Sequence, residues 1–505
     1  MSSSTGFKFR EAARGVSLPR LDTLSPVASR LLRCAWWALS GAALSRGLQL
    51  LAFIPVARIL GTVEFGQVAM VQSTVGSFGA LAGLGMGLTA NKFISELRNV
   101  DPRRAGRILT LTTAVALVSS VTVALGLWFF AETLATRTLA SPLLTPLLRL
   151  GAVLLFLSTF TGVQMGTLAG FENFRRIAWI NLWSGLACFP LMITGAHFAG
   201  AAGTLWALVL STVLTCVLSE REIRRQAAAS HMGYTLGGLW MERRTVWEFS
   251  LPSLVAGLVS APAMWVANAV LVNQPNGYSE LGVFNAALRI KQLPEMVVAT
   301  MMSPLLPVLS EQMGRSALSE CRQSLHYAFA VAWLFIVPVS LAQVAYPEAT
   351  VWVYGSAYRN HPGLVQWVML QACMLGLLSP VGSLLASLNR MWLGVAINTW
   401  WAVVFLGLCV ALVPSYGSAG LAAAFALAHV VSSVSFLFYL RRWSPGLLHG
   451  IPVFTRFRVL ALAAALAACA HRLGSPAVKL AVTVIIVLAV VRAGVRNSAA
   501  ATTAV

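Results

Sequence analysis

The stretch from residue 44 to residue 73, LSRGLQLLAFIPVARILGTVEFGQVAMVQS, decides the fold of this chain. It reads as an apolar helix that carries one arginine, Arg46, then a turn near Gly61, then a second apolar helix that begins at Gln67. The sequence EFGQV at residues 64–68 is echoed by ELGVF at residues 280–284, an offset of 280 − 64 = 216 residues. Such an echo between two hydrophobic halves predicts an internally duplicated membrane protein with its substrate site between the repeats.

The composition indicates a polytopic membrane protein. Of the 505 residues, 58% are hydrophobic and only 10% are charged, which is too few charges to solvate a soluble surface of this size. The formal net charge of +20 comes from short basic clusters between apolar runs, so we expect no nucleic-acid partner. The seven cysteines are scattered without a Cys-x-x-Cys pair, and neither a disulfide framework nor a metal site is expected.

The number of helices follows from the thickness of the bilayer. A hydrocarbon core of about 30 Å needs about 20 apolar residues per helix, and this ruler predicts an all-α fold of about fourteen transmembrane helices. They are expected at residues 35–57, 67–90, 106–130, 145–169, 176–197, 199–219, 247–273, 281–309, 324–346, 363–388, 391–413, 417–440, 455–471 and 475–493. Lys and Arg concentrate in alternate loops, which supports an even number of helices and places both termini in the cytoplasm.

The longest polar connection divides the chain into two lobes of six helices. The predicted organisation is a cytoplasmic tail (1–34), an N-terminal lobe (35–219), a cytoplasmic linker (220–246), a C-terminal lobe (247–440), a linker with helices thirteen and fourteen (441–493) and a C-terminal tail (494–505). Because six is even, both lobes enter the membrane in the same sense, as parallel repeats require. The sequence has no Walker-type motif, so no nucleotide or other cofactor is expected.

Charged side chains at bilayer depth are few and therefore informative, because each costs about 2.5 kcal/mol or more there. They are Arg46 in the first predicted helix and Arg289, Lys291 and Glu295 in the eighth. Lys291 and Glu295 are four residues apart and can pair on one helix face. The pair is either a packing ion pair or a site where Glu295 titrates and couples transport to an ion.

Amides flank both arginines. Asn285, Arg289 and Gln292 share one face of the eighth helix, and Gln49 shares a face with Arg46 on the first. Guanidinium groups bind phosphate in a bidentate manner, so two arginines from opposite lobes predict a phosphate-bearing anion between them. The alternative is that each arginine snorkels to the interface or bonds helix-end carbonyls.

Other polar residues allow two interpretations. Trp265 and Asn268 in the seventh helix can stack on and hydrogen-bond a sugar, or can pack between helices.

The first six predicted helices carry no carboxylate except near their ends, which disfavours an antiporter of cationic drugs. The seven histidines are dispersed, without a serine or cysteine nucleophile and an orienting acid beside them, so we do not expect an enzyme.

Several motifs resemble one known family. Ser45-Arg46, ARILG at 57–61, EFG at 64–66 and GLG at 83–85 resemble the first two helices of the oligosaccharide flippases of polysaccharide biosynthesis. These flippases share a superfamily with multidrug and toxin extrusion exporters and with the peptidoglycan lipid flippase. The runs FSLP at 249–252, LGVFNAA at 281–287 and PVLS at 307–310 resemble the start of the second lobe.

The resemblance implies a V-shaped pair of lobes in the bacterial inner membrane. Such a protein moves an undecaprenyl-diphosphate-linked repeat unit of a capsule, O-antigen or exopolysaccharide to the periplasmic leaflet by alternating access. Arg46 and Arg289 would hold the diphosphate, Lys92 would gather anionic headgroups at the cytoplasmic entrance, and the sugars and cavity wall would involve Gln49, Trp265, Asn268, Asn285, Lys291 and Gln292. The expected partners are membrane lipids, the polysaccharide polymerase and glycosyltransferases.

Three alternatives stay open at this point. Peptidoglycan flippases tend to carry a second arginine six residues after the first, where this chain has Ala52, so a peptidoglycan precursor is the second candidate substrate. A cation-coupled multidrug antiporter would require a buried carboxylate, for which the sequence offers only Glu295. A membrane scaffold for glycosyltransferases would not need the arginines at all.

Overall fold

The computed structural model describes residues 26–230, 258–302, 305–314, 318–348, 353–358, 362–387 and 391–443, with short pieces of the linker and of the C-terminal segment, and most side chains from Gly47 onward. These residues are almost entirely helical. The elements are α2 (Pro26–Gly83), α3 (Met86–Leu97), α4 (Pro102–Thr133), the π-helix η2 (Leu134–Thr138), α5 (Leu144–Gly170), α6 (Phe174–Ala229), α9 (Ser260–Val272), α10 (Gly277–Met302), α11 (Leu305–Gly314), α12 (Leu318–Ala345), the 3-10 helix η5 (Ser356–Tyr358), α14 (Pro362–Ser387) and α15 (Met391–Trp443).

These helices overlap the first twelve predicted spans. Three of them, α2, α6 and α15, each contain two predicted spans joined across a sharp backbone break, at Gly61, at Ala199–Gly200 and at Gly417. The chain is therefore an all-α polytopic membrane protein. Of the last two predicted spans, the structure describes helix at residues 462–466 and 481–490, and most of the other residues lie outside the described ones. The count of fourteen therefore stays a prediction.

Two predicted spans are interrupted. The helix expected at 67–90 is broken between α2 and α3, because Leu84 and Gly85 have φ values of 45° and 69°, outside the helical region. The span expected at 281–309 corresponds to two helices, since α10 ends at Met302 and α11 begins at Leu305. Hydropathy does not detect either interruption, because Leu84-Gly85 and Ser303-Pro304 are each only two residues long within long apolar runs.

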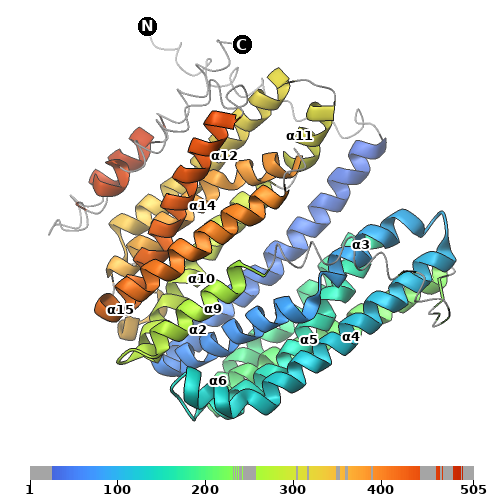
Figure 1. Cartoon of the computed structure of the whole chain (residues 1–505), viewed down its shortest axis with the longest axis horizontal. Coiled ribbons are helices and arrows are strands. Elements are labelled where there is room, and N and C mark those ends of the chain that lie inside the picture. Colours follow the sequence, from blue (N-terminus) through green and yellow to red (C-terminus); the bar gives the residue numbers. More distant parts are fainter. Residues whose placement is uncertain are drawn as a thin grey trace, which may run out of the picture.

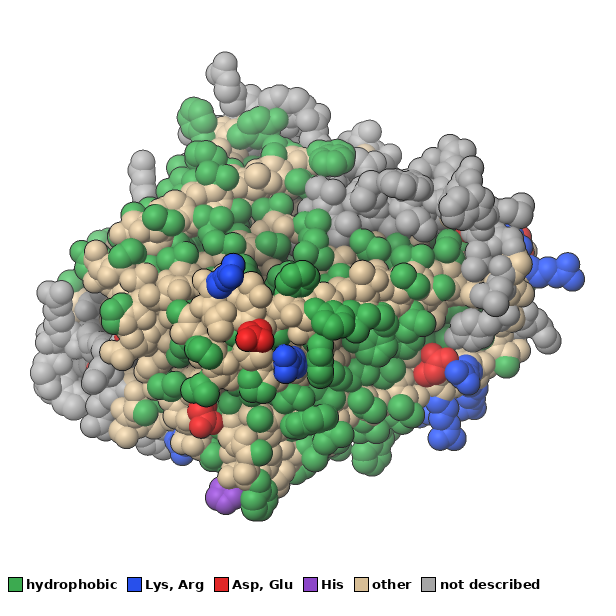
Figure 2. All heavy atoms as spheres, turned by 60° about the horizontal axis from the view of Figure 1, so that its bottom comes forward, with side chains coloured by type: hydrophobic (Ala, Val, Ile, Leu, Met, Phe, Trp, Pro, Cys, Tyr) green, Lys and Arg blue, Asp and Glu red, His purple; other side chains and the backbone are tan. Residues whose placement is uncertain are grey.

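The surface of the described part fits a lipid environment. Seven of its helices are long and apolar enough to cross a membrane; α10, which carries Arg289, Lys291 and Glu295, is not among them. Large apolar side chains such as Phe129 and Phe130 are exposed. On the face shown in Figure 2, hydrophobic side chains dominate and charged side chains are few.

The helices form two lobes that meet at one end and separate toward the other (Figure 1). The first lobe contains α2 to α6 and the second contains α9 to α15, and α2 also packs against α9 and α10 of the second lobe. This arrangement is the V shape that the resemblance implies. We call the end where the lobes meet, around residues 57–66 and 278–282, the closed end.

A reciprocal glycine contact forms the closed end. A Cβ atom on Gly66 would lie 1.8 Å from the carbonyl oxygen of Tyr278, and one on Gly282 would lie 2.0 Å from the carbonyl oxygen of Thr62. The backbones of the two lobes can therefore approach this closely only because both positions are glycine. Positions 62 and 278 are equivalent in the two repeats, and so are positions 66 and 282, because each pair is separated by the 216 residues of the sequence echo. The contact is therefore a product of the duplication.

The echo also explains a pair of glutamates. Glu64 accepts a hydrogen bond from the backbone N–H of Ala201 at 2.9 Å, and Glu280 accepts one from the backbone N–H of Ser418 at 3.0 Å. In each lobe, the residue that donates this N–H comes directly after a glycine with φ near +55°. The glycines are Gly200 in α6 and Gly417 in α15. In each lobe a carboxylate thus caps the helix that begins after the break.

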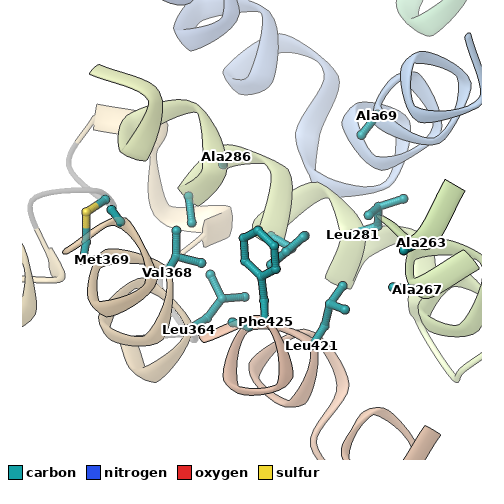
Figure 3. Close-up of a cluster of buried hydrophobic side chains, with 14 of the residues drawn as sticks. Ala69, Ala263, Ala267, Leu281, Ala286, Leu364, Val368, Met369, Leu421 and Phe425 are labelled. Atoms are coloured by element: carbon teal, nitrogen blue, oxygen red, sulfur yellow. The ribbon is translucent and has the colours of Figure 1, made fainter. Parts of the chain in front are cut away.

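The second lobe has a continuous apolar core. Phe425 of α15 lies between α10 and the α14 side chains Leu364 and Val368, whereas Leu281 of α10 lies near Ala263 of α9 (Figure 3). Val368, Met369 and Leu364 are fully buried. This packing fixes the position of α10, the helix that carries the charged side chains considered next.

Candidate substrate cavity between the lobes

Arg289 occupies the central position between the two lobes. Its Nη2 donates to Oε1 of Gln72 in α2 at 2.6 Å, and its Nε donates to Oδ1 of Asn285 in α10 at 3.3 Å. The guanidinium lies 4.0 Å from the centroid of the Phe53 ring, a cation–π contact with α2. Since a guanidinium has five N–H groups, Arg289 retains donors for an anionic ligand.

Two cavities meet at this guanidinium, with volumes of about 470 Å3 and about 370 Å3. Gln49 and Arg289 line both of them. The larger cavity lies between α2, α10 and α14 and contains Gln292, Glu295 and Ser379 on its wall. Both volumes lie in the range of ligand sites, and the larger one can hold a phosphate-linked sugar.

The smaller cavity lies in the first lobe, and hydroxyl groups make it polar. Ser158 of α5 and Ser184, Ser211 and Thr212 of α6 line it, together with Gln72. Sequence reasoning did not identify these hydroxyls or Gln72. Single serines and threonines are common in membrane helices, and only the fold brings these four together. Gln72 could have been predicted from the sequence as Gln49 was, because it is also an amide within an apolar helix.

The structure brings together five of the predicted site residues. Gln49, Arg289, Gln292 and Glu295 line the central cavities, and Asn285 contacts them through its hydrogen bond with Arg289. Arg46 lies in α2 one turn before Gln49, but its side chain is outside the described residues. Its contact with a ligand stays a prediction.

Lys291 points away from this centre. Its ammonium lies 3.1 Å from Oε1 of Glu295, which is the ion pair expected at this spacing, and it donates to Oε1 of Gln371 in α14 at 2.6 Å. The ammonium is also 4.9 Å from the Phe425 ring centroid. Lys291 lines a third cavity of about 670 Å3 within the second lobe, whereas Glu295 lines the central one.

Trp265 and Asn268 join the lobes. The indole N–H of Trp265 donates to Oγ1 of Thr74 at 3.0 Å, and the amide of Asn268 donates to Oγ of Ser73 at 2.9 Å. Trp265 also packs edge-on against Phe78, with ring centroids 5.9 Å apart. Neither residue lines the three cavities described above, and their contacts are those of the packing alternative.

Lys92 lies on α3, at the end of the molecule opposite the closed end. Its side chain is exposed, with the ammonium 5.1 Å from the ring of Phe93. Arg98 follows at the end of α3, and Arg103, Arg104 and Arg107 lie on α4. Arg98 pairs with Glu172, and Arg104 and Arg107 share Glu242, so the arginines outnumber their acidic partners. This end of the first lobe is therefore positively charged.

Comparison with known proteins supports one family. Residues 31–313 match the family model described as polysaccharide biosynthesis protein. The chain is 26% identical to the succinoglycan biosynthesis transport protein ExoT of Rhizobium meliloti, over 75% of this chain and 72% of that protein. It is 21% identical to the EPS I polysaccharide export inner membrane protein EpsE of Ralstonia nicotianae, over 77% of this chain and 89% of that protein.

Solved structures share the fold. The lipid II flippase MurJ in an inward closed conformation superimposes with a TM-score of 0.69 at 14% identity, covering 89% of this chain and 96% of MurJ. A multidrug resistance MATE transporter of the MOP superfamily gives 0.68 in its inward-facing conformation, at 15% identity over 84% of this chain and 99% of the transporter. An outward-facing MATE structure gives 0.56, at 17% identity over 88% of this chain and 98% of the transporter.

Proposed function

The chain belongs to the polysaccharide biosynthesis protein family, and we propose that it translocates a lipid-diphosphate-linked oligosaccharide across the bacterial inner membrane. The lipid carrier in this proposal is undecaprenyl, and the oligosaccharide is the repeat unit of a capsule, O-antigen or exopolysaccharide. The chain acts as a transporter and not as an enzyme, and its mechanism is alternating access of the central cavities to the two sides of the membrane.

The position of Arg289 carries this proposal. It is a cation at the meeting point of two cavities, held by one amide from each lobe and backed by an aromatic ring. A diphosphate offers the planar pair of oxygens that a guanidinium binds in a bidentate manner. Arg46, one turn from Gln49, is proposed as the second cation, and the hydroxyls of the first-lobe cavity as sugar contacts.

The direction of transport follows from the charges at the open end. We assign that end to the cytoplasm, because Lys92 and the arginines at 98–107 lie there and basic residues concentrate on the cytoplasmic side. Both termini are then cytoplasmic. Lys92 gathers anionic headgroups near the opening, and the reciprocal glycine contact at the closed end separates the cavity from the periplasm.

The alternative substrates fit less well. Ala52, at the position where peptidoglycan flippases tend to carry an arginine, is fully buried, so this site offers no third cation. Among the described residues that line the two central cavities, the single carboxylate is Glu295, and its ion pair with Lys291 leaves little negative charge for a cationic drug. The polysaccharide polymerase and the glycosyltransferases are proposed partners that supply and consume the substrate.

The decisive experiment removes the cavity cations in cells whose single copy of the gene carries Arg46→Ala, Arg289→Ala or both. Each charge-assisted hydrogen bond to a phosphate contributes about 1.5–3 kcal/mol, so export falls at least about tenfold for Arg289→Ala. Surface polysaccharide decreases while the lipid-linked unit accumulates in the cytoplasmic leaflet.

Arg149→Ala is the matched control, because Arg149 is exposed and its guanidinium lies 5.9 Å from the Trp128 ring centroid, away from the cavities. All variants are compared at equal abundance in the membrane. Normal polysaccharide and normal lipid-linked sugar in the double variant would refute the site and favour the scaffold or drug-exporter alternatives.

A further inference from the structure

A chain of hydrogen bonds links three helices of the second lobe at His429. Lys291 of α10 donates to Oε1 of Gln371 in α14 at 2.6 Å, and Nε2 of Gln371 lies 3.4 Å from Nε2 of His429 in α15. Lys291 is 6% exposed and Gln371 is fully buried. All three side chains line the cavity of about 670 Å3.

The charge on Lys291 fixes the orientation of Gln371. An ammonium group has three donors and no acceptor, so the atom that faces it must be the amide oxygen. The NH2 group of the same amide then faces His429. Because an NH2 group only donates, Nε2 of His429 must accept and carries no proton in this arrangement.

The other side of the imidazole agrees with a neutral ring. Its Nδ1 lies 2.9 Å from the backbone carbonyl oxygen of Phe425, which can only accept, so Nδ1 carries the single ring proton. The indole N–H of Trp401 also points at Nδ1, at 2.9 Å, but it can donate there only in the other tautomer, in which Nδ1 is unprotonated. The tautomer with the proton on Nδ1 satisfies Phe425 and Gln371 together. The ring thus faces two donors, Gln371 and Trp401, and one acceptor, Phe425, whereas an imidazolium needs two acceptors.

We propose that His429 is a proton-binding site that couples this transporter to a proton gradient, and that Gln371 makes its protonation and the bond from charged Lys291 mutually exclusive. When a proton adds to the lone pair of Nε2, the Gln371 amide must rotate so that its oxygen accepts the new N–H. Its NH2 group then faces Lys291, whose ammonium retains only Glu295 as an acceptor. The coupling role rests on the proposed function, whereas proton binding itself does not.

No other titratable group competes for this role among the described residues packed around His429. The helix α9 contains none, and on α14 the single one is Cys373, whose thiol contacts Ser340 on α12. From α10 the charged groups that face this network are Lys291 and, behind it, Glu295. On α15 the near neighbours are Phe425, Trp401 and Ser433, which donates to the backbone carbonyl of His429.

The position of Lys291 connects this site to the substrate cavity. Lys291 is two residues from Arg289 on α10, and its partner Glu295 lines the central cavity. Leu375 and Ser379 of α14 line both the central cavity and the cavity at His429. Release of Gln371 therefore loosens α10 from α14 at the level where α10 contacts the first lobe through Gln72.

The test uses the full chain in lipid nanodiscs, with protons as the ligand and no substrate. Spin labels at Ser95→Cys in α3 and Glu320→Cys in α12, in a background without the seven native cysteines, report the distance between the lobes at the open end. Lowering the pH from about 8 to about 5, the range in which histidine titrates, shifts this distance in the parent protein. His429→Gln abolishes the shift.

Lys291→Met tests whether protonation of His429 is coupled to the charge on Lys291 or whether Lys291 only packs beside it. Without the ammonium, Gln371 rotates freely, so the midpoint of the transition moves up by at least about one pH unit, a tenfold change in proton concentration. Gln371→Leu tests the same link if Lys291→Met does not fold. His326→Gln, which changes another buried histidine of this lobe, keeps the parent response.

Three results would overturn the proposal: no response in the parent protein, a retained response in His429→Gln, or an unchanged midpoint in both Lys291→Met and Gln371→Leu. Because no oligosaccharide is present, a failure of the proposed substrate site leaves this result unaffected, and the two ideas are tested separately.

Discussion

At the scale of single residues, Gln72 is as important to the central site as the predicted arginine. It lies in α2 and holds the guanidinium of Arg289 in α10 at 2.6 Å, so it bridges the two lobes. A ligand that binds the remaining N–H groups of Arg289 therefore shares the guanidinium with Gln72. Gln72 is therefore proposed to position the cation and to sense its occupancy.

Gln72→Glu tests this role. A carboxylate at this position would form a charge-assisted bond to Arg289 and neutralise the cation that the substrate needs, at a cost to substrate binding of about 1.5–3 kcal/mol. We expect polysaccharide export to fall about 10- to 100-fold, measured as surface polysaccharide per cell.

The control is Gln72→Met, which has similar volume and no charge. It should reduce export less than Gln72→Glu does. If both variants export as well as the parent, Gln72 does not act on the substrate through Arg289.

The sequence alone identified the central cation and several of its neighbours, but not Gln72 or the hydroxyls of the first-lobe cavity. Arg289, Asn285 and Gln292 were predicted because helical periodicity places them on one face, and Gln49 because it follows Arg46 by one turn. Periodicity cannot tell which helix faces which, so a sugar contact and packing between helices were both open for Trp265 and Asn268, which bond Thr74 and Ser73 between the lobes. The hydroxyls of the first-lobe cavity come from two helices and have no signature within either one.

At the scale of the elements, duplication explains the two capped breaks. Glu64 binds the backbone after Gly200, and Glu280 binds the backbone after Gly417, with the same geometry in each lobe. Each carboxylate fixes the turn between the fifth and sixth helices of its lobe to the second helix. The sequence echo shows that Glu64 and Glu280 are equivalent. It does not show that each glutamate binds next to a glycine, because Gly200 and Gly417 are about 140 residues further along the chain.

Glu64→Ala and Glu280→Ala should therefore destabilise their lobes to a similar extent. Each leaves a backbone N–H without its acceptor, which costs about 1–3 kcal/mol when that group is shielded from water. The apparent Tm of the purified protein in detergent should fall in both variants.

Glu132→Ala is the matched change on an exposed glutamate at the end of α4, and its apparent Tm should stay at the parent value. A fall in one variant only would show that the two caps, although similar in geometry, do not contribute alike.

At the scale of the whole molecule, the chain is a pair of lobes joined at one end by contacts that the duplication repeats. The backbones cross at Gly66 and Gly282, and the hydroxyl of Ser279 donates to Oγ1 of Thr62 at 2.7 Å. Transport by alternating access requires these contacts to separate while the open end closes. Hydropathy predicted the two lobes and their helices. The direction in which the V opens depends on contacts such as that of Ser279 with Thr62, 217 positions apart, which hydropathy cannot detect.

Alternating access is tested most directly by locking the closed end with a disulfide and following the lipid-linked oligosaccharide between the leaflets. Thr62→Cys with Ser279→Cys places two thiols where the hydroxyls already touch, on the side that we assign to the oxidising periplasm, so a disulfide can form. We expect the oxidised double variant to retain the lipid-linked unit in the cytoplasmic leaflet and a reductant to restore export, while each single variant exports normally. Undiminished export with the disulfide formed would contradict alternating access through this end.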